Sequence, residues 1–383
     1  MKVTQMWMYI NENPNYFSNQ FILIIMKIQT EPIGSIPRPK YLVDALNAFS
    51  QNQIDKTELS GLFDEALKDT IKRFEETGSP VISDGEQSKP SFATYPIDGM
   101  QNLSPDGIVI PFADGHTRQL PKITSGPFHY QTYANRYLEK AMQLTTLPVK
   151  QAVISVSAIS LLYPQEGIEG YSNADFTNDL LNEAEADIRK SLNSGAYKVQ
   201  IDFTEARLAL KLDPSGGLLK SFIDLNNKVL MRFTEEERKK IGVHSCPGAD
   251  RDSTHSAEIS YADLLPLLFQ LNAGNFYLEY AAEKDKRSVL SSIKESIKPS
   301  QHVFLGVIDV LNPKVESPEK VCDTILEAAE FIPITQLGTT DDCGFSPFAD
   351  DSSRSRDTAF AKIKSRVDGT WLAEKKLSQT NSK

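Results

Sequence analysis

Hydrophobic positions along this chain follow two periods that alternate from one segment to the next. Phe63, Leu67, Ile71 and Phe74 recur every three to four positions, which is the period of an amphipathic helix. Residues 149–156 form instead a short, mostly apolar run, as expected of a strand that is buried on both faces. The alternation predicts an α/β protein with a parallel sheet.

Eight segments have the apolar character of strands, and helical segments separate them. The strands are expected near Ile33 and at residues 81–86, 149–156, 197–202, 241–246, 276–280, 303–309 and 334–340. Helices are expected around residues 63–74, 176–192, 221–240, 261–271, 287–297, 318–331 and 356–375. Eight such units favour a (β/α)8 TIM barrel, with a doubly wound open sheet as the alternative. Residues 102–130 interrupt the pattern and predict a β-hairpin insertion after the second strand.

The pattern divides the chain into three parts, with no linker inside the body. Residues 1–26 are rich in Asn, Met and aromatic residues without a clear period. We expect them to be a poorly ordered N-terminal extension. Alternatively, Met1 is an upstream translation start that the natural protein does not use. Residues 27–376 are expected to form a single catalytic barrel, and residues 377–383 a flexible C-terminal tail.

Composition narrows the class of protein. The chain has 383 residues, 40% of them hydrophobic, and a formal net charge of −10 without a Lys/Arg cluster, so nucleic acid is not expected as a partner. The longest apolar run near the start, residues 21–26, is far shorter than a membrane span or a signal peptide requires. Three cysteines in so long a chain suit a reducing compartment, and we expect a cytoplasmic protein.

Polar residues stand where the expected strands end. In a barrel of this kind the loops after the strands meet at one mouth, where the chemistry occurs. The residues at these ends are Ser35, Asp84, Glu86, Asp202, His244, Cys246, Glu279, Asp309, Asp341, Asp342 and Cys343. The sequence therefore places the candidate site at this mouth.

His244 and Cys246 are two positions apart on one strand, so their side chains point to the same side. Together with Cys343 and the carboxylate of Glu279 from later strands, they offer one nitrogen, one oxygen and two sulfurs. Zinc accepts all three donor types in tetrahedral geometry, which predicts a Zn2+ site. The alternative is that both cysteines are small core residues and that His244 is a buried histidine with satisfied hydrogen bonds.

The chain resembles the catalytic, C-terminal half of cobalamin-independent methionine synthase and its short single-barrel relatives, from about residue 30 to residue 375. The resembling segments are Ile33-Gly34-Ser35-Ile36-Pro37, Gly85-Glu86, Gln200-Ile201-Asp202, His244-x-Cys246, Glu279 and Asp342-Cys343-Gly344. The resemblance implies that His244, Cys246, Glu279 and Cys343 bind zinc. It also implies that Ser35, Glu86 and Asp202 bind the amino-acid end of homocysteine.

The mechanism implied by the resemblance is methyl transfer to a thiol. Coordination to zinc deprotonates the homocysteine thiol, whose sulfur replaces one ligand, with Glu279 as the candidate, and attacks an electrophilic methyl group. The family has a histidine as proton donor after the seventh strand, where this chain has Leu311. It also has a donor-stacking tryptophan after the third strand, where this chain has none. Asp309 is the candidate catalytic acid in place of the histidine, and it would need a raised pKa.

These departures leave several functions open. The methyl donor is expected to be a methylated folate or a methyl-corrinoid protein. A second enzyme hypothesis is a thiol alkyltransferase acting on another electrophile, as in epoxide:coenzyme M transferases, although two carboxylates argue against the sulfonate of coenzyme M. A third is a zinc-binding barrel without catalysis that stores or senses a thiol.

Overall fold

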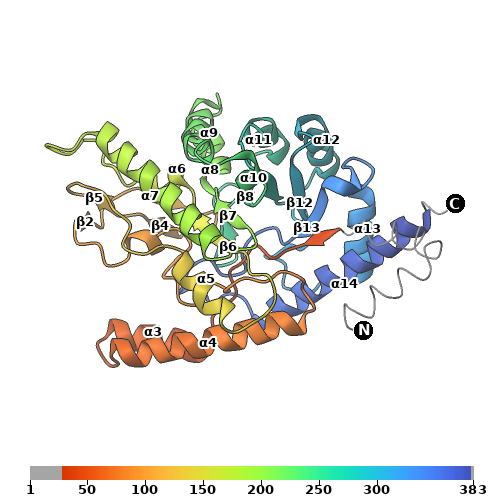
Figure 1. Ribbon diagram of the computed structural model, residues 1–383, viewed down its shortest axis with the longest axis horizontal. Coiled ribbons are helices and arrows are strands. Elements are labelled where there is room, and N and C mark those ends of the chain that lie inside the picture. The colour runs from red at the N-terminus through yellow and green to blue at the C-terminus, as the bar shows by residue number, and fades with distance from the viewer. Residues whose placement is uncertain (1–27, 381–383) are drawn as a thin grey trace, which may run out of the picture.

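The computed structural model of the chain describes residues 28–380 (Figure 1). The expected N-terminal extension, residues 1–26, lies outside this range. Seven strands form one central sheet, and every pairing within it is parallel. The strands are β1 (Gln29–Thr30), β6 (Gln151–Ile154), β7 (Val199–Asp202), β8 (Ile241–Ser245), β11 (Asn275–Leu278), β12 (His302–Gly306) and β13 (Leu337–Thr340). The α/β class and the parallel sheet expected from the sequence are therefore confirmed.

The order of the strands in space is β1-β13-β12-β11-β8-β7-β6, so each strand of this sheet after β6 lies beside its predecessor, whereas β1 and β6 stand at opposite edges. The segment expected as the second strand contributes a single parallel bridge, Ile82 to Val149, at the free side of β6. Within residues 28–380 no ladder joins this segment to β1. A backbone hydrogen bond of 3.0 Å from the Ile36 N–H to the Gly85 carbonyl connects the loops that follow them.

In the view of Figure 1 helices surround the strands of the sheet, with α9, α11 and α12 above them and α3 and α4 below them. The larger helices are α3 (Lys40–Ser50), α4 (Lys56–Glu76), α7 (Asn173–Asn193), α9 (Gly217–Leu230), α11 (Tyr261–Leu268), α12 (Lys286–Ser296), α13 (Pro318–Ala328) and α14 (Arg356–Thr380). Shorter ones are α5 (Asn135–Met142), α6 (Val156–Ser160), α8 (Glu205–Leu212) and α10 (Glu235–Arg238), with the 3-10 turns η1 (Tyr95–Ile97) and η2 (Ile334–Gln336). The apolar faces of most of these helices pack with the strands into one large core cluster, whereas α3 packs against the first half of α4 in a smaller one.

Four short strands occupy the stretch where the sequence predicts a hairpin. β3 (Val109–Pro111) pairs antiparallel with β4 (Thr117–Gln119), and β2 (Leu103–Ser104) pairs antiparallel with β5 (Lys122–Ile123). The tip contacts a further antiparallel pair, β9 (Ala249–Asp250) and β10 (Ser253–Thr254), through a hydrogen bond from the Ala113 N–H to the Thr254 carbonyl. The hairpin thus lies against the loop that follows β8.

Several boundaries differ from the expected ones. β1 ends before Ile33, because residues 31–37 leave the sheet to form the site described below. The expected helix at residues 221–240 is two helices, α9 and α10, since Thr234 begins a new helix with a capping box. Helix α14 continues through residues 377–380, which the sequence assigns to the flexible tail.

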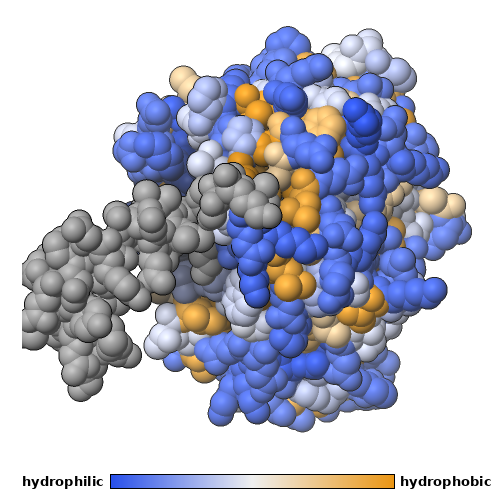
Figure 2. All heavy atoms as spheres, turned by 90° about the vertical axis from the view of Figure 1, so that its right-hand side faces the viewer, coloured by the Kyte–Doolittle hydropathy of each residue, from blue (hydrophilic) through white to orange (hydrophobic). Residues whose placement is uncertain are grey.

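No helix in residues 28–380 combines the length and hydropathy needed to cross a bilayer. Hydrophobic residues on the face shown in Figure 2 form small groups among hydrophilic ones. The interior, in contrast, contains charged groups. Arg366 of α14 and Asp341 after β13 form a hydrogen-bonded ion pair with side-chain exposures of 0% and 1%. Arg366 also donates to Thr30 Oγ1 of β1 at 3.1 Å, so this pair fastens the last helix to two neighbouring strands.

Replacing Arg366 by Met is expected to destabilise the fold by about 3–5 kcal/mol, because the Asp341 carboxylate stays buried without its counter-ion. Urea unfolding measures this change. The exposed pair Lys364–Asp368 provides the control, and Lys364→Met is expected to change stability by no more than about 0.5 kcal/mol. Equal stabilities of the two variants would contradict a structural role for the buried pair.

Candidate functional site

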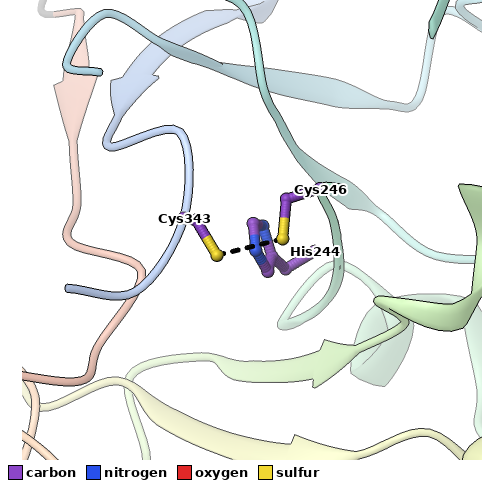
Figure 3. A group of neighbouring side chains, drawn as sticks. All are labelled: His244, Cys246 and Cys343. Carbon is purple, nitrogen blue, oxygen red and sulfur yellow. Dashed lines mark hydrogen bonds between the residues drawn. The ribbon is translucent and has the colours of Figure 1, made fainter. Parts of the chain in front are cut away.

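Three side chains with metal-binding atoms meet beyond the carboxyl end of β8. His244 lies in β8, Cys246 directly follows it, and Cys343 follows β13, and one ligand atom from each lies within 4.8 Å of the others. Figure 3 shows the three side chains pointing toward one another, with the two sulfur atoms 3.0 Å apart. All three are buried. The structure thus brings together three of the four residues expected to bind a metal.

The histidine is oriented for binding. Its Nδ1 atom lies 3.1 Å from the Tyr277 carbonyl oxygen, which as an acceptor requires the proton to be on Nδ1. The buried Nε2 atom has no hydrogen-bond partner in residues 28–380. A buried nitrogen lone pair without a partner costs free energy unless a ligand satisfies it. A metal ion beside the two sulfurs would do so.

The two thiols differ in acidity. The hydrogen bond to Cys246 and the neighbouring His244 hold the pKa of Cys343 well below its usual value. Burial raises the pKa of Cys246 well above its usual value, and the charge on Cys343 adds to this. Cys343 is therefore the more acidic of the two thiols, which favours its binding to a cation.

Glu279, the fourth expected ligand, stands just after β11 beside this group but is not part of it. Its Oε2 atom accepts a hydrogen bond of 2.9 Å from Arg207, whose side chain is 1% exposed. The same Arg207 nitrogen donates to Glu283 at 2.6 Å. Burial raises the pKa of Glu279 well above its usual value, and Arg207 opposes the shift. Glu279 thus has a resident counter-ion.

Asp342 fixes the position of Cys343. Its Oδ1 atom accepts the N–H groups of Tyr280 and Ala281 at 2.9 and 2.8 Å, and Oδ2 accepts that of Ala282 at 2.8 Å. The carboxylate thereby joins the loop after β13 to the loop after β11, although β12 lies between these strands. Gly306, the last residue of β12, permits the crossing, because a Cβ there would stand 2.1 Å from Asp342 Oδ1.

Ser35 lies against the same loop. Its hydroxyl accepts a hydrogen bond of 3.2 Å from the Ser346 N–H, and its carbonyl accepts one of 3.0 Å from the Phe345 N–H. A Cβ on Gly344 would stand 2.2 Å from Ser35 Oγ, so this contact requires glycine. In the segment Asp342-Cys343-Gly344, the first residue therefore fixes the loop by its hydrogen bonds and the second offers a sulfur atom to a metal. The third leaves room for the Ser35 hydroxyl.

The two carboxylates expected to bind the substrate line one cavity of about 600 Å3 with Ser35, His244 and Cys343. Glu86 accepts a hydrogen bond of 3.0 Å from the buried ammonium of Lys89. Burial, with the nearby charges of Asp202 and Asp84, raises the pKa of Glu86 to about 7 despite Lys89. Burial likewise raises the pKa of Asp202. A cation in addition to Lys89, placed between the carboxylates of Glu86 and Asp202, would reduce the repulsion between them.

A chain of polar contacts holds Asp202 from the interior of the sheet. Gln200 Nε2 donates to Asp202 Oδ1 at 2.8 Å, and Gln200 Oε1 accepts from Lys150 Nζ at 2.7 Å. The Lys150 nitrogen lies 3.7 Å from Glu31 Oε2, and burial lowers the pKa of Lys150 to about 7. These partners fix the orientation of the Gln200 amide and so present its N–H to Asp202.

The hairpin between residues 103 and 123 covers the cavity. Ile110, Phe112 and Arg118 line it, and Phe112 packs edge-on against His255 with ring centroids 5.5 Å apart. His255 is not among the residues that the sequence indicates for the site, yet it is 5% exposed and lines the cavity. Burial lowers its pKa to about 4, so the ring is neutral near pH 7. No spacing in the sequence indicates this placement.

Asp309 lies elsewhere. It follows β12, and its Oδ1 atom accepts the N–H groups of Leu311 and Asn312 at 2.9 and 3.3 Å in a local turn. It is not among the residues that line the cavity. The structure therefore gathers seven of the eight expected site residues at one end of the sheet. The carboxylate of Asp309 instead accepts hydrogen bonds within its own loop.

Glu205 is a buried carboxyl that sequence reasoning missed, because the residues around it come from α6 and α9. Burial raises its pKa to about 7 from an ordinary value of 4.5. Since the folded state holds this proton more tightly than the unfolded chain, the stabilisation is fully present below pH 4.5. It is lost as the pH rises through 7.

We expect Glu205→Gln, which cannot ionise, to gain stability over the wild type as the pH rises from 5 to 8. The pKa shift corresponds to a gain on the order of 3 kcal/mol. Urea unfolding of both proteins at the two pH values measures the gain. A difference between the two proteins that does not change with pH would show that Glu205 titrates normally.

Comparison with known proteins identifies the family to which the chain belongs. The model of the cobalamin-independent synthase catalytic domain matches residues 28–369. The methionine synthase of Sulfurisphaera tokodaii is 21% identical over 350 residues, which are 91% of this chain and 94% of that protein. The 5-methyltetrahydropteroyltriglutamate–homocysteine methyltransferase of Trichodesmium erythraeum is 23% identical over 82% of this chain, which spans 40% of that longer protein.

Solved structures show the same fold. A B12-independent methionine synthase from Shewanella, in complex with selenomethionine, superposes with a TM-score of 0.71 at 19% identity, covering 92% of this chain and 99% of that one. A methyltransferase from Methanosarcina mazei gives a TM-score of 0.51 at 12% identity, covering 90% and 94%. From the extent of the family match, the chain belongs to the family of cobalamin-independent methionine synthase catalytic domains.

Proposed function

We propose that this protein is a zinc-dependent methyltransferase that transfers a methyl group to the thiol of homocysteine and forms methionine. The observation that supports this most is one cavity that His244 and Cys343 line together with Glu86 and Asp202. We also propose that the parallel sheet closes into a (β/α)8 barrel between Ile82 and β1, with residues 103–123 as a hairpin insertion. The proposed zinc site needs cysteines that are free thiols, and free thiols imply a reducing compartment, which we propose is the cytoplasm.

The donor atoms fit zinc. Two sulfurs and an imidazole nitrogen, all buried, are the soft and borderline ligands that this ion prefers. Three protein ligands with a fourth position for substrate are typical of catalytic zinc sites. Glu279 is the candidate for the exchangeable ligand, because Arg207 already neutralises it and can keep it when the substrate sulfur binds.

The amino-acid end of homocysteine fits the other side of the cavity. Glu86 and Asp202 are placed to accept hydrogen bonds from its ammonium group, which supplies the cation that their raised pKa values call for. Ser35, whose hydroxyl already accepts the Ser346 N–H, has its own proton available for the substrate carboxylate. This set discriminates against thiols that lack an ammonium group.

In the reaction, Glu86, Asp202 and Ser35 hold the substrate so that its sulfur lies beside His244 and Cys343. Bound Zn2+ lowers the pKa of a coordinated thiol, so that the sulfur is anionic at neutral pH. The sulfur forms a bond to the methyl carbon, the bond between the methyl group and the donor breaks, and the donor atom retains the electron pair. Burial excludes water from the reacting atoms.

We propose a methylated folate as the methyl donor. Membership of the cobalamin-independent family gives no support to a corrinoid protein in this role. The folate leaving group is an amine that must gain a proton. Leu311 stands where the family has its histidine, and it packs against the core instead of lining the cavity. Asp309 remains a candidate for this proton only if its loop rearranges.

Cys343→Ser is expected to weaken zinc binding more than about 100-fold, since loss of a direct ligand exceeds the cost of losing an outer partner. Competition with a chromogenic chelator measures the affinity. Cys322→Ser is the control, because Cys322 lies on α13 outside the group. Retained zinc affinity in Cys343→Ser would exclude Cys343 as a ligand.

Calorimetry on the zinc-loaded protein is expected to show tight binding of homocysteine with proton release, and weak binding of coenzyme M and cysteine. Glu86→Gln and Asp202→Asn should each lower the affinity for homocysteine by about 10-fold or more, the value of a charge-assisted hydrogen bond. Equal affinities for all three thiols would refute the proposed substrate. Methyl transfer from 5-methyltetrahydropteroyltriglutamate, followed as methionine formed, tests the complete reaction.

A further inference from the structure

A second cavity of about 1030 Å3 adjoins the one that contains the metal-binding group. The two share Phe92, Ile110, Arg118, Thr204, His255 and Phe348. Most of the remaining wall is apolar, formed by Ile97, Leu120, Ile154, Ile159, Leu162 and Leu208. A chamber of this size and lining suits a molecule with an apolar ring system.

Glu205, the first residue of α8, lines this cavity and is 6% exposed. Its Oε1 atom lies 2.5 Å from the hydroxyl oxygens of both Ser155 and Ser157. Ser155 Oγ already accepts from the Ala158 N–H, and Ser157 Oγ accepts from Asn226 Nδ2. Both hydroxyls therefore donate to Oε1, which is thus used as an acceptor.

The other oxygen of Glu205 is free. Oε2 is buried and has no hydrogen-bond partner in residues 28–380. Because Oε1 is saturated by two donors, a proton on this carboxyl must reside on Oε2. An acid kept only for packing would be expected to satisfy both oxygens. An unpartnered Oε2 on a side chain that lines a largely apolar cavity therefore points to a ligand.

We propose that Glu205 is the residue by which this enzyme recognises its methyl donor, through a hydrogen bond between Oε2 and one polar atom at the edge of the donor's ring system. The inference rests on the proposed function. The thiol has its own polar partners in the first cavity, so the second cavity remains for the donor. The shared wall lets the methyl group of a bound donor face the metal-binding group.

The nature of the hydrogen bond follows from the carboxyl itself. Burial raises the pKa of Glu205 to about 7, so near neutral pH Oε2 either donates or accepts. A glutamine keeps its carbonyl oxygen toward the two serines and presents an amide N–H where Oε2 stood. A leucine of similar size presents nothing polar. The two substitutions therefore separate hydrogen bonding from the filling of space.

Steady-state kinetics of Glu205→Leu and Glu205→Gln, with 5-methyltetrahydropteroyltriglutamate and homocysteine, test the proposal. Glu205→Leu should raise KM for the folate by about 10-fold or more, while KM for homocysteine and the zinc content stay as in the wild type. Glu205→Gln should restore most of this loss. Asp187→Asn is the matched control, a buried carboxylate that lines neither cavity, and should leave KM for the folate unchanged.

A folate KM in Glu205→Leu within about 2-fold of the wild-type value overturns the proposal, even if methyl transfer proceeds. If the wild type transfers no methyl group, the proposed function fails, and Glu205 is tested by calorimetric binding of the same folate. Weaker binding to Glu205→Leu than to the wild type then supports the role of Glu205. Equal binding, or no binding to the wild type, overturns it.

Discussion

The hydrogen bonds that one carboxylate accepts from three consecutive backbone N–H groups hold the site together. Asp342 crosses β12 to reach residues 280–282, and so joins the loop after β13 to the loop after β11. Cys343 follows Asp342 directly and Glu279 precedes Tyr280 directly. The positions of both relative to His244 and Cys246 therefore depend on this interaction. The same interaction requires Gly306, because a side chain at this position would occupy the space of the Asp342 carboxylate.

The remainder of the site is arranged around burial of charge. Arg207 neutralises Glu279, Lys89 neutralises Glu86, and Gln200 supplies an N–H to Asp202. Each partner holds its carboxylate in one rotamer. The carboxylates are too deeply buried for water to do this. A buried charge without a partner would move or take up a proton, so these second residues preserve the geometry that the substrate meets. The polar interior around Lys150 and Glu31 extends this support below the site.

Sequence patterns predict the parts of this structure that repeat. Period and strand ends identify the parallel α/β sheet, and the strand-end positions of His244, Cys246 and Cys343 identify the metal-binding group. Contacts between distant segments could not be predicted. Glu279 pairs with Arg207, 72 positions earlier in the chain, and Glu205 meets two serines about 50 positions before it. Asp309 has the right place at a strand end, but the turn that follows uses its carboxylate.

The distribution of polar groups between the two cavities explains how one centre can serve two substrates of different character. The first cavity contains ionisable groups that match a zwitterion, because burial raises the pKa values of Glu86 and Asp202 and an ammonium group between them would oppose this shift. The second is mostly apolar, and its polar lining residues beside Glu205 and the shared wall are Ser91, Thr94, Gln119 and Asp350. A zwitterion would lose more hydration than the apolar part of that wall returns. On the proposed function, this difference in lining would keep the thiol in the first cavity and leave the second for the ring system of the methyl donor.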